Sequence, residues 1–383
     1  MKIIFRVILI KIVCTLFLSF SMAVAADKKP FSTSPPAKIA KKWRIGYLEG
    51  GPYKNYPKTL IATIDGLSEL GWIEPVTFPQ EDKKDTRKLW TWLTANVKGR
   101  YLEFVPDAYD SNGWDRELQK KIRSRLIRKL NEKQGIDLMI AMGTWAGQDL
   151  ANNDHSVPTI VCSVSDAVAS KIVKSVEDSG YDHVHAHLAP KRFERQIEAF
   201  HDVIGFEKLG VVYVDSLDGR SYAGLESIRN IAEKRKFKIV ECPIEMHNTN
   251  ETQGPLAVQC SHELAPKIDA FYIPMMSAVN SKTLPKILSA MNAHKVPTFS
   301  QLGSEDVRHG VLLGISDSAN FRGVGKFHAE TIAKIINGAK PRELSQIYEF
   351  PRKIAFNKAT AKMIDLGADI YDLISEVAEE VYE

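Results

Sequence analysis

The stretch HVHAH places three histidines, His183, His185 and His187, at alternate positions of the chain. On a strand, all three imidazoles would point to one face of the sheet, and zinc and copper both accept imidazole nitrogen as a ligand. Same-face neighbours on a strand lie roughly 7 Å apart, so one straight strand rarely closes a tight three-ligand site. We therefore favour a partly exposed, titrating strand at a hinge and keep a metal site as the alternative.

Sequence motifs of common enzyme classes are missing. The chain has no G-x-S-x-G, H-E-x-x-H or G-x-x-x-x-G-K-[ST] pattern, and the glycines of YLEGGPY (47–53) lack the dinucleotide pattern G-x-G-x-x-G. We expect a protein without a cofactor and without catalysis. A secreted hydrolase or lyase stays open as the alternative, because doubly wound folds serve many chemistries.

Side chains suited to binding a small molecule follow the predicted strands of the first half. Tyr53 and Tyr56 follow the first strand, and aromatic rings form stacking walls for planar or apolar ligands. Thr144 and Trp145 open a helix after the apolar run IDLMIAM; Thr144 as N-cap, with the free N–H groups of the next turn, favours an anionic group. Asp166, in SVSDAVAS, suits an amine or hydroxyl. Core packing and helix capping are the alternatives.

The second half carries a similar set of predicted ligand-binding residues: Asp215, Tyr222, Met276, Ser277 and Gln301. Each lies at a strand end or opens the helix that follows. Methionine suits an adaptable apolar pocket. Asp215 and Arg220 could instead pair with each other at the surface, which contributes little.

Short apolar runs alternate with helical patterns along the chain, and these elements must position the residues above. The first series has predicted strands at 43–50, 100–107, 136–142 and 157–164, with helices at 58–72, 115–135, from 144 and from 165. The second has strands at 208–215, 237–244, 268–275, 296–302 and 310–316, with helices at 191–204, 220–236, 279–293 and 322–338. Such repetition predicts two doubly wound α/β lobes joined by a hinge, with the ligand beyond the carboxyl ends of the strands.

The first 25 residues have the charges and apolar run of a secretory signal peptide, with cleavage near Ala25. A retained membrane anchor is the alternative. Lys2, Arg6 and Lys11 are three of 51 basic residues, so removing them leaves 48 against 47 acidic ones. This near-neutral balance gives no electrostatic argument for binding to nucleic acid. We expect an exported, periplasmic monomer with a flexible leader at 26–42.

Three cysteines remain after that segment. Cys162 lies in a predicted core strand and is expected to be a free thiol. Cys242 and Cys260 could form a disulfide in an oxidising compartment, but the sequence does not give the distance between them. Both possibilities stay open.

Three stretches together resemble the substrate-binding proteins of ABC importers for aromatic amino acids and related ligands. They are residues 143–173 (GTWAGQDL onward), 194–215 (ERQIEAF onward) and 296–341 (VPTFSQL onward), and the resemblance extends over about residues 43–368. It implies a type I periplasmic-binding fold. It also implies a first lobe of 43–188 plus 316–338 and a second lobe of 189–315 plus 339–383.

By this resemblance the chain is a receptor that closes on a small solute, amino-acid-like or aromatic and apolar, and delivers it to an ABC permease. A periplasmic sensor domain of a membrane signalling protein is the alternative partner. The chain departs from the family at LEGGPYKNYP (48–57), at Met275, Met276 and Ser277, and in an insertion at 72–99 that holds an extra helix near RKLWTWL. These positions are predicted to face the ligand, so the ligand stays unnamed.

Overall fold

The computed structural model describes residues 31–38, 41–132, 135–245, 250–316, 321–349 and 353–383. The predicted signal peptide and its cleavage site lie outside these residues. Within them, no helix has the length and apolar character needed to cross a membrane. The described chain forms two compact units. We call residues 31–190 with 321–349 lobe 1, and residues 191–316 with 353–383 lobe 2.

Lobe 1 is built on a five-stranded parallel sheet in the order β2-β1-β3-β4-β5. Its strands are β1 (Trp43–Glu49), β2 (Leu102–Ser111), β3 (Leu138–Met142), β4 (Thr159–Cys162) and β5 (Val184–Ala186). The strand order reverses between β1 and β3, which is the topological switch point where doubly wound sheets bind ligands.

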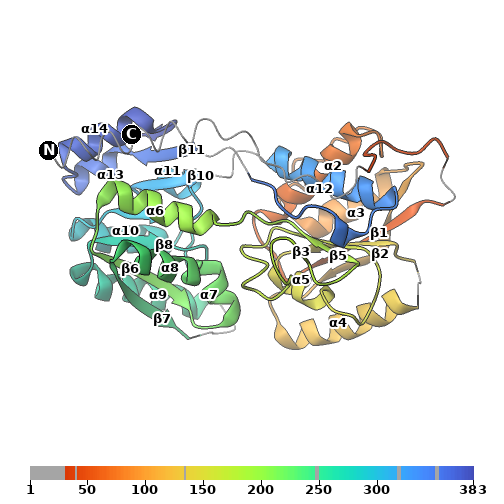
Figure 1. Ribbon diagram of the computed structural model, residues 1–383, viewed down its shortest axis with the longest axis horizontal. Coiled ribbons are helices and arrows are strands. Elements are labelled where there is room, and N and C mark those ends of the chain that lie inside the picture. The colour runs from red at the N-terminus through yellow and green to blue at the C-terminus, as the bar shows by residue number, and fades with distance from the viewer. Residues whose placement is uncertain (1–30, 39–40, 133–134, 246–249, 317–320, 350–352) are drawn as a thin grey trace. The chain divides into compact units, whose positions relative to one another are not determined.

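Helices cover both faces of this sheet (Figure 1). They are α2 (Tyr56–Glu69), α3 (Thr86–Asn96), α4 (Arg116–Asn131), α5 (Thr144–Leu150) and α12 (Phe321–Ile336), with the short η3 (Pro341–Glu343). Side chains along β1 point alternately to the two faces of the sheet. Ile45 and Tyr47 pack with α2, α3 and α12 on one face, whereas Leu48 packs with α4 and α5 on the other. The apolar runs therefore have two buried faces, as parallel strands require.

The segment 72–99, which we predicted to be an insertion, contributes to the core of lobe 1. Leu89, Trp90 and Leu93 of α3 are almost fully buried, and the indole Nε1 of Trp90 donates a hydrogen bond to the carbonyl of Val105 at 2.9 Å. Trp90 also packs against the ring of Tyr47. The extra helix is thus a structural part of the lobe.

Residues 31–38 pack on lobe 1, although we expected a flexible leader there. The indole of Trp72 donates to the carbonyl of Thr33 at 2.8 Å, and the amide of Asn337 donates to the carbonyls of Ser32 and Ser34. Phe31 packs against the core. These bonds tie the segment to helix ends far away in sequence.

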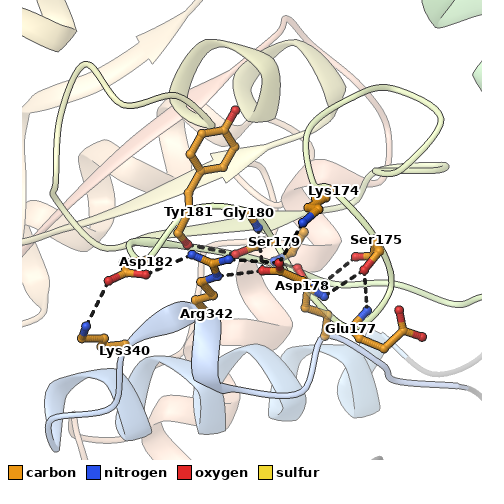
Figure 2. A network of polar contacts seen from close by, with 12 residues as sticks. Lys174, Ser175, Glu177, Asp178, Ser179, Gly180, Tyr181, Asp182, Lys340 and Arg342 are labelled. Atoms are coloured by element: carbon orange, nitrogen blue, oxygen red, sulfur yellow. Dashed lines mark hydrogen bonds and ion pairs between the residues drawn. The ribbon is translucent and has the colours of Figure 1, made fainter.

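Lobe 1 extends to residue 349, eleven residues beyond the predicted end at 338. A clasp of ion pairs fixes this extension: the guanidinium of Arg342 binds Asp178 through two nitrogens, at 2.7 and 3.0 Å, and Asp182 at 3.3 Å (Figure 2). Lys340 also pairs with Asp182 at 3.0 Å. Leu188 pairs with Ile347 in a parallel bridge. The chain after α12 is therefore bound to the loop before β5.

Lobe 2 has a seven-stranded sheet in the order β12-β11-β10-β9-β8-β6-β7. Its strands are β6 (Lys208–Val214), β7 (Lys238–Ile244), β8 (Ala270–Ile273), β9 (Thr298–Ser300), β10 (Leu313–Ser316), β11 (Lys353–Asn357) and β12 (Glu380–Tyr382). Only β11 against β10 is antiparallel among these pairs. The strands β7-β6-β8-β9-β10 repeat the topology of lobe 1, with a switch point between β6 and β8.

The helices of lobe 2 lie on both faces of its sheet (Figure 1). They are α6 (Arg192–Ile204), α7 (Leu217–Ala223), α8 (Leu225–Arg235), α9 (Asn250–Leu264), α10 (Leu284–Ala293), α11 (Ser304–Arg308), α13 (Lys358–Met363) and α14 (Ala368–Val377), with η1 (Ala265–Lys267). A disulfide joins Cys242 of β7 to Cys260 of α9, with Cα atoms 6.0 Å apart. Cys162 is a buried free thiol, as predicted.

Two helix predictions are wrong. The segment after Ser165 forms turns, because Asp166 accepts the N–H groups of Val168 and Ala169 and no helical ladder follows. The predicted helix 220–236 is two helices, broken at Gly224, which has a φ of +64°. The elements α9, α11, α13, α14, β11 and β12 were not predicted.

Candidate ligand site at the strand ends

The carboxyl ends of three strands lie level with one another in lobe 1. Glu49, the last residue of β1, pairs in register with Ser111 of β2 and with Met142 of β3. The segments that leave these strands therefore begin at one edge, at the switch point of the sheet. We call this place the lobe 1 edge.

The glycines after β1 let Trp114 lie directly on the backbone. A Cβ added at Gly50 would lie 2.8 Å from the Trp114 ring, and one at Gly51 would lie 2.7 Å from it. The indole Nε1 of Trp114 donates a hydrogen bond to the carbonyl of Pro52 at 3.0 Å. The two glycines are thus explained by the close approach of an indole from the loop after β2.

Trp145 completes a cluster of two indoles and a guanidinium at this edge. Its ring meets Trp114 edge to face, with centroids 5.3 Å apart, and the guanidinium of Arg116 lies 3.7 Å from its centroid. This cation–π geometry places the planar cation over the indole. We call Trp114, Arg116 and Trp145 the indole stack.

Gly143, between β3 and α5, is required by Tyr56. Its φ is +87°, and a side chain there would overlap the Tyr56 hydroxyl. Tyr56 is buried and meets Tyr53 edge to face at 5.2 Å. The prediction that Thr144 is the N-cap is wrong: Gly143 occupies that position, and Thr144 is the first helical residue, only 4% exposed.

Two buried carboxyl groups lie just below the lobe 1 edge. Glu49 accepts hydrogen bonds from the hydroxyls of Tyr47, Thr86, Tyr109 and Ser111, at 2.6–3.0 Å. Burial raises the pKa of Glu49. Thr86 belongs to α3, so the segment 72–99 supplies one of the four hydroxyls.

Asp149, in α5, is the second buried carboxyl. The amides of Asn112 and Gln119 donate to its two oxygens, each at 2.9 Å, and burial raises the pKa of Asp149 to about 6. Gln119 in turn accepts a hydrogen bond from Arg116 at 2.9 Å. The carboxyl is therefore linked to the indole stack through one glutamine.

Asp166 caps a turn with its side chain. Its Oδ1 accepts from the backbone N–H groups of Val168 and Ala169 at 3.0 and 2.9 Å. Capping, the alternative that we weighed, is thus what the structure shows for one oxygen, although the element is a turn. Its binding of a ligand stays a prediction.

In lobe 2, Asp215 follows β6 and pairs with Arg220 of α7, with Nε and Oδ1 2.9 Å apart. Their side chains are 45% and 52% exposed, so this is the surface ion pair that we named as the alternative. After β8, Met276 is half-buried against the core and Ser277 is exposed. Ligand binding by these residues stays a prediction.

Gln301 connects three segments at the carboxyl ends of lobe 2. Its Nε2 donates to the carbonyl of Tyr222 at 2.8 Å, and its Oε1 accepts the N–H of Met275. Its own carbonyl accepts from Gln196, which in turn accepts the Tyr272 hydroxyl at 2.8 Å. The loops after β8 and β9 and the end of α7 are thereby held at fixed separation.

Two of the three histidines, His185 and His187, bind backbone carbonyl groups. Nε2 of His185 donates to the carbonyl of Ser345 at 2.8 Å, and Nε2 of His187 to that of Tyr348 at 3.1 Å. His183 and His185 are 8% and 1% exposed, so the prediction of a partly exposed strand is wrong for both. The segment 340–349 covers His185, whose ring binds the carbonyl of Ser345, whereas the ring of His183 packs against those of His155 and Tyr181. Within the described ranges, no three His, Cys, Asp or Glu side chains could hold a metal ion together.

Trp114 and Arg116 were not predicted as site residues. Trp114 lies in the turn after β2 and Arg116 is the first residue of α4, where our prediction had only a loop and a charged helix. Glu49, at the end of an apolar strand, and Asp149, inside α5, were also not predicted; both are buried by long-range contacts. A weak signal was present, since Glu49 is a carboxylate inside an otherwise apolar strand end.

The fold is that of known solute-binding proteins. The chain is similar to a solved ABC domain in complex with L-Trp from Streptococcus pneumoniae, with a TM-score of 0.65 and 18% identity over 89% of this chain and 100% of that one. It is equally similar to a conserved domain protein from Vibrio cholerae, with a TM-score of 0.64 and 18% identity over the same shares. These likenesses establish a type I periplasmic-binding fold.

The family follows from the sequence itself. The family model for ABC transporter substrate binding protein matches residues 112–382. The chain therefore belongs to the ABC transporter substrate-binding protein family.

One curated relative is a tyrosine-binding protein of Clostridioides difficile. It is 24% identical over 232 residues, which are 60% of this chain and 63% of the relative. The match thus spans less than two thirds of the relative's length. A solved ligand-free, open substrate-binding protein with adhesive properties from Clostridium difficile is 20% identical over 85% of this chain and 95% of that one, with a TM-score of 0.54.

Proposed function

We propose that this protein is an exported solute receptor whose two lobes close on an amino acid with an aromatic or apolar side chain. The observation that carries the proposal is the lobe 1 edge, where indole and phenol rings gather at the switch point of a parallel sheet. Family membership supports binding without chemical conversion. Binding would shift the population from open to closed.

The ligand class rests on the side chains at the two sets of strand ends. In lobe 1 the predicted residues are the aromatic Tyr53, Tyr56 and Trp145, of which Tyr56 and Trp145 are 4% and 8% exposed, and the polar Thr144 and Asp166. In lobe 2 the corresponding predicted residues are Asp215, Tyr222, Met276, Ser277 and Gln301. The names of two similar proteins, one tyrosine-binding and one bound to L-Trp, agree with an aromatic amino acid.

The partner that we propose is an ABC permease in the membrane, which would receive the ligand from the closed form. Export to the periplasm depends on the signal peptide predicted at 1–25. A periplasmic sensor domain would respond to the same closure. Ligand uptake by cells lacking this protein separates the two: reduced uptake supports the permease, and normal uptake with a lost transcriptional or second-messenger response supports the sensor.

A thermal-shift screen followed by calorimetry tests the ligand class. We expect L-tyrosine or L-tryptophan to raise Tm and to be recovered unchanged, since a ligand that binds only the folded state stabilises it. Small-angle scattering should show a more compact molecule with ligand. Turnover of the ligand, or no response to any amino acid, would overturn the proposal.

Two variants test the position of the site. Trp145→Ala and Asp166→Ala should each weaken binding by at least about 1 kcal/mol, the loss expected for a buried aromatic or polar anchor. Trp92→Ala and Asp154→Ala are matched controls in lobe 1, since Trp92 packs on Phe78 and Asp154 forms an ion pair with Arg123. Unchanged affinity in both test variants would move the site elsewhere.

A further inference from the structure

We propose that a clasp in lobe 1 sets the affinity of the receptor for its ligand from outside the ligand site, by anchoring a paired hinge ribbon. The clasp consists of Asp178, Asp182, Lys340 and Arg342. The hinge ribbon consists of residues 186–188 and 346–348, which pair with each other within lobe 1. This inference rests on the proposed function, because it describes what controls the same lobe closure.

The hinge ribbon carries both passages of the chain from lobe 1 to lobe 2. The chain leaves lobe 1 after Pro190 and again after Glu349. Just before these points, the N–H of Leu188 donates to the carbonyl of Gln346 at 2.7 Å, and the N–H of Tyr348 donates to the carbonyl of Leu188 at 3.0 Å. Two connections that are bonded to each other bend together, whereas two separate ones turn independently. The ribbon therefore limits the movements that a hinge allows.

The ribbon is too short to be stable without support. Two-stranded pairing is marginally stable in water even over longer segments, and the pairing here is an isolated bridge. Gln346 supplies support, because its Nε2 donates to the carbonyls of Ser175 and Val176, each at 3.1 Å, and its Oε1 accepts the N–H of Ala186 at 3.4 Å. Its side chain is buried. The ribbon is thereby fastened to the loop before β5.

The clasp holds that loop in place. Asp178 accepts from Nε and Nη2 of Arg342 at 2.7 and 3.0 Å, and from the N–H of Gly180 at 2.9 Å (Figure 2). A bidentate arginine–carboxylate pair fixes the orientation of both partners. The side chains of Arg342 and Asp178 are 40% and 29% exposed, and ion pairs with such exposure contribute little to stability. We therefore expect the clasp to affect the order of the ribbon more than the stability of the fold.

Order in the ribbon changes affinity through the cost of closure. A ligand that binds the closed form must order any segment that is loose in the open form, and this lost entropy lowers the apparent affinity. With the clasp intact, the ribbon is ordered before the ligand arrives. Where the ribbon ends, Lys191 has a φ of +58° and the chain turns into α6. Closure then bends the chain at this turn and leaves the ribbon paired.

Arg342→Gln and Arg44→Gln form the central comparison. Arg44 is a matched control in the same lobe, because it binds Asp137 through two nitrogens, at 3.0 and 3.2 Å, near the start of β1. Arg44→Gln should lower Tm at least as much as Arg342→Gln, since Asp137 is less exposed than Asp178. Only Arg342→Gln should weaken the binding of L-tyrosine or L-tryptophan, by about 3- to 10-fold, as for residues that change coupling without contacting a ligand. Calorimetry measures the affinities.

Amide hydrogen exchange without ligand shows whether the clasp orders the ribbon. In Arg342→Gln, the N–H groups of Leu188 and Tyr348 should exchange about 10-fold faster than in wild type, because local opening exposes them. Arg44→Gln should leave both exchange rates unchanged. Equal protection of these two amides in wild type and Arg342→Gln would overturn the proposal, whatever the ligand is.

Asp178→Asn removes the same bond from the other side, and it serves if Arg342→Gln does not fold. Its loss of affinity should be no larger than that of Arg342→Gln, because Asp182 still pairs with Arg342 at 3.3 Å. The double variant should bind as weakly as Arg342→Gln alone, since residues that act through one contact are not additive. Losses that add in full would show that the two residues act separately, and the clasp would not be the cause.

The outcomes separate the two proposals. If wild type binds an aromatic amino acid and Arg342→Gln binds it equally well, the control of affinity is overturned and the receptor function stands. Equal losses of affinity in Arg342→Gln and Arg44→Gln would show a general loss of stability and would also overturn it. If wild type binds no amino acid, the proposed function fails and the control of affinity fails with it, whereas hydrogen exchange still decides whether the clasp orders the ribbon.

Discussion

The carboxyl ends of the two sheets are built in different ways. At the lobe 1 edge, rings lie on glycine backbone: Trp114 on Gly50 and Gly51, and Tyr56 on Gly143. At the corresponding ends in lobe 2, amide and carbonyl groups hold the loops together through Gln301. Both sheets have the same strand order around their switch points, so topology fixes where a site can form and local packing decides its stiffness.

This difference predicts where each lobe tolerates change. Where a ring packs directly on a glycine, there is no room for an added methyl group. Adding even one carbon to a densely packed core lowers the stability of the protein. A glutamine that connects three segments fails when its hydrogen-bonding groups are removed, even at constant volume. An exposed ion pair contributes little in either case.

The largest effect should come from Gly143→Ala in lobe 1. The added carbon would overlap the Tyr56 hydroxyl, and a φ of +87° strains any residue with a Cβ. Backbone strain and overpacking together should lower the free energy of unfolding by about 4 kcal/mol. Chemical denaturation measures it.

A substitution at a second glycine distinguishes backbone strain from steric overlap with a ring. Gly338 has a φ of +99° and nothing within 4 Å of an added Cβ, so Gly338→Ala should lose only about 1 kcal/mol. Tyr56→Phe combined with Gly143→Ala should recover part of the loss. Equal losses at Gly143 and Gly338 would contradict the idea that the ring sets the difference.

Lobe 2 should respond most to Gln301→Leu. The substitution leaves the N–H of Met275 and the carbonyl of Tyr222 without their buried partner, which should reduce the free energy of unfolding by about 3 kcal/mol. Gln259→Leu is the control, because Gln259 is exposed and bonds only across one helical turn to Glu263. Should both leucine variants unfold at the same denaturant concentration, Gln301 would not be the connecting residue that we describe.

The sequence predicted the sheets well and their edges incompletely. Apolar runs such as residues 136–142 end at glycine, and that pattern is enough to place a strand and the start of a helix. Trp145 and Tyr56 were predicted as site residues because they follow such runs. Trp114 was missed, since its role depends on the loop after β1, more than sixty residues earlier, and no local pattern carries that contact.

Lobe 2 was predicted less completely for a similar reason. The strand β11 runs antiparallel to β10, and β12 is a three-residue edge strand. Both depend on pairing across the sheet and lack the strand–helix alternation that revealed the others.

In lobe 1, Asp166 was expected to open a helix. Its side chain caps a turn instead, because the same residue types cap turns and helices.

The free energy of unfolding should depend on pH through Asp149, a buried carboxyl group of lobe 1. Burial raises the pKa of this carboxyl from its ordinary 3.8 to about 6, so the folded state holds the proton more tightly than the unfolded one. Its contribution to stability is therefore present below about pH 4 and is lost as the pH rises to about 6. Asp149→Asn should gain about 2 kcal/mol relative to wild type between pH 4 and pH 7.5.

Denaturation at the two pH values measures this gain. Asp154→Asn is the control, because Asp154 is exposed on the same lobe. A difference between wild type and Asp149→Asn that does not change with pH would mean that the carboxyl is not held by burial, and it would weaken the contrast between the buried network of lobe 1 and the exposed charges of lobe 2.

The smallest effect should come from the ion pair after β6 in lobe 2. Asp215 and Arg220 are both about half exposed, where solvent screens the attraction and ordering two long side chains costs entropy, so Arg220→Ala should change the free energy of unfolding by less than about 1 kcal/mol. Salt reduces an exposed interaction further, since the Debye length is about 10 Å at 0.1 M. Wild type and Arg220→Ala should therefore converge as salt increases. A loss above about 2 kcal/mol that persists in high salt would show that lobe 2, too, relies on a charge at its strand ends, and the proposed contrast between the two lobes would no longer hold.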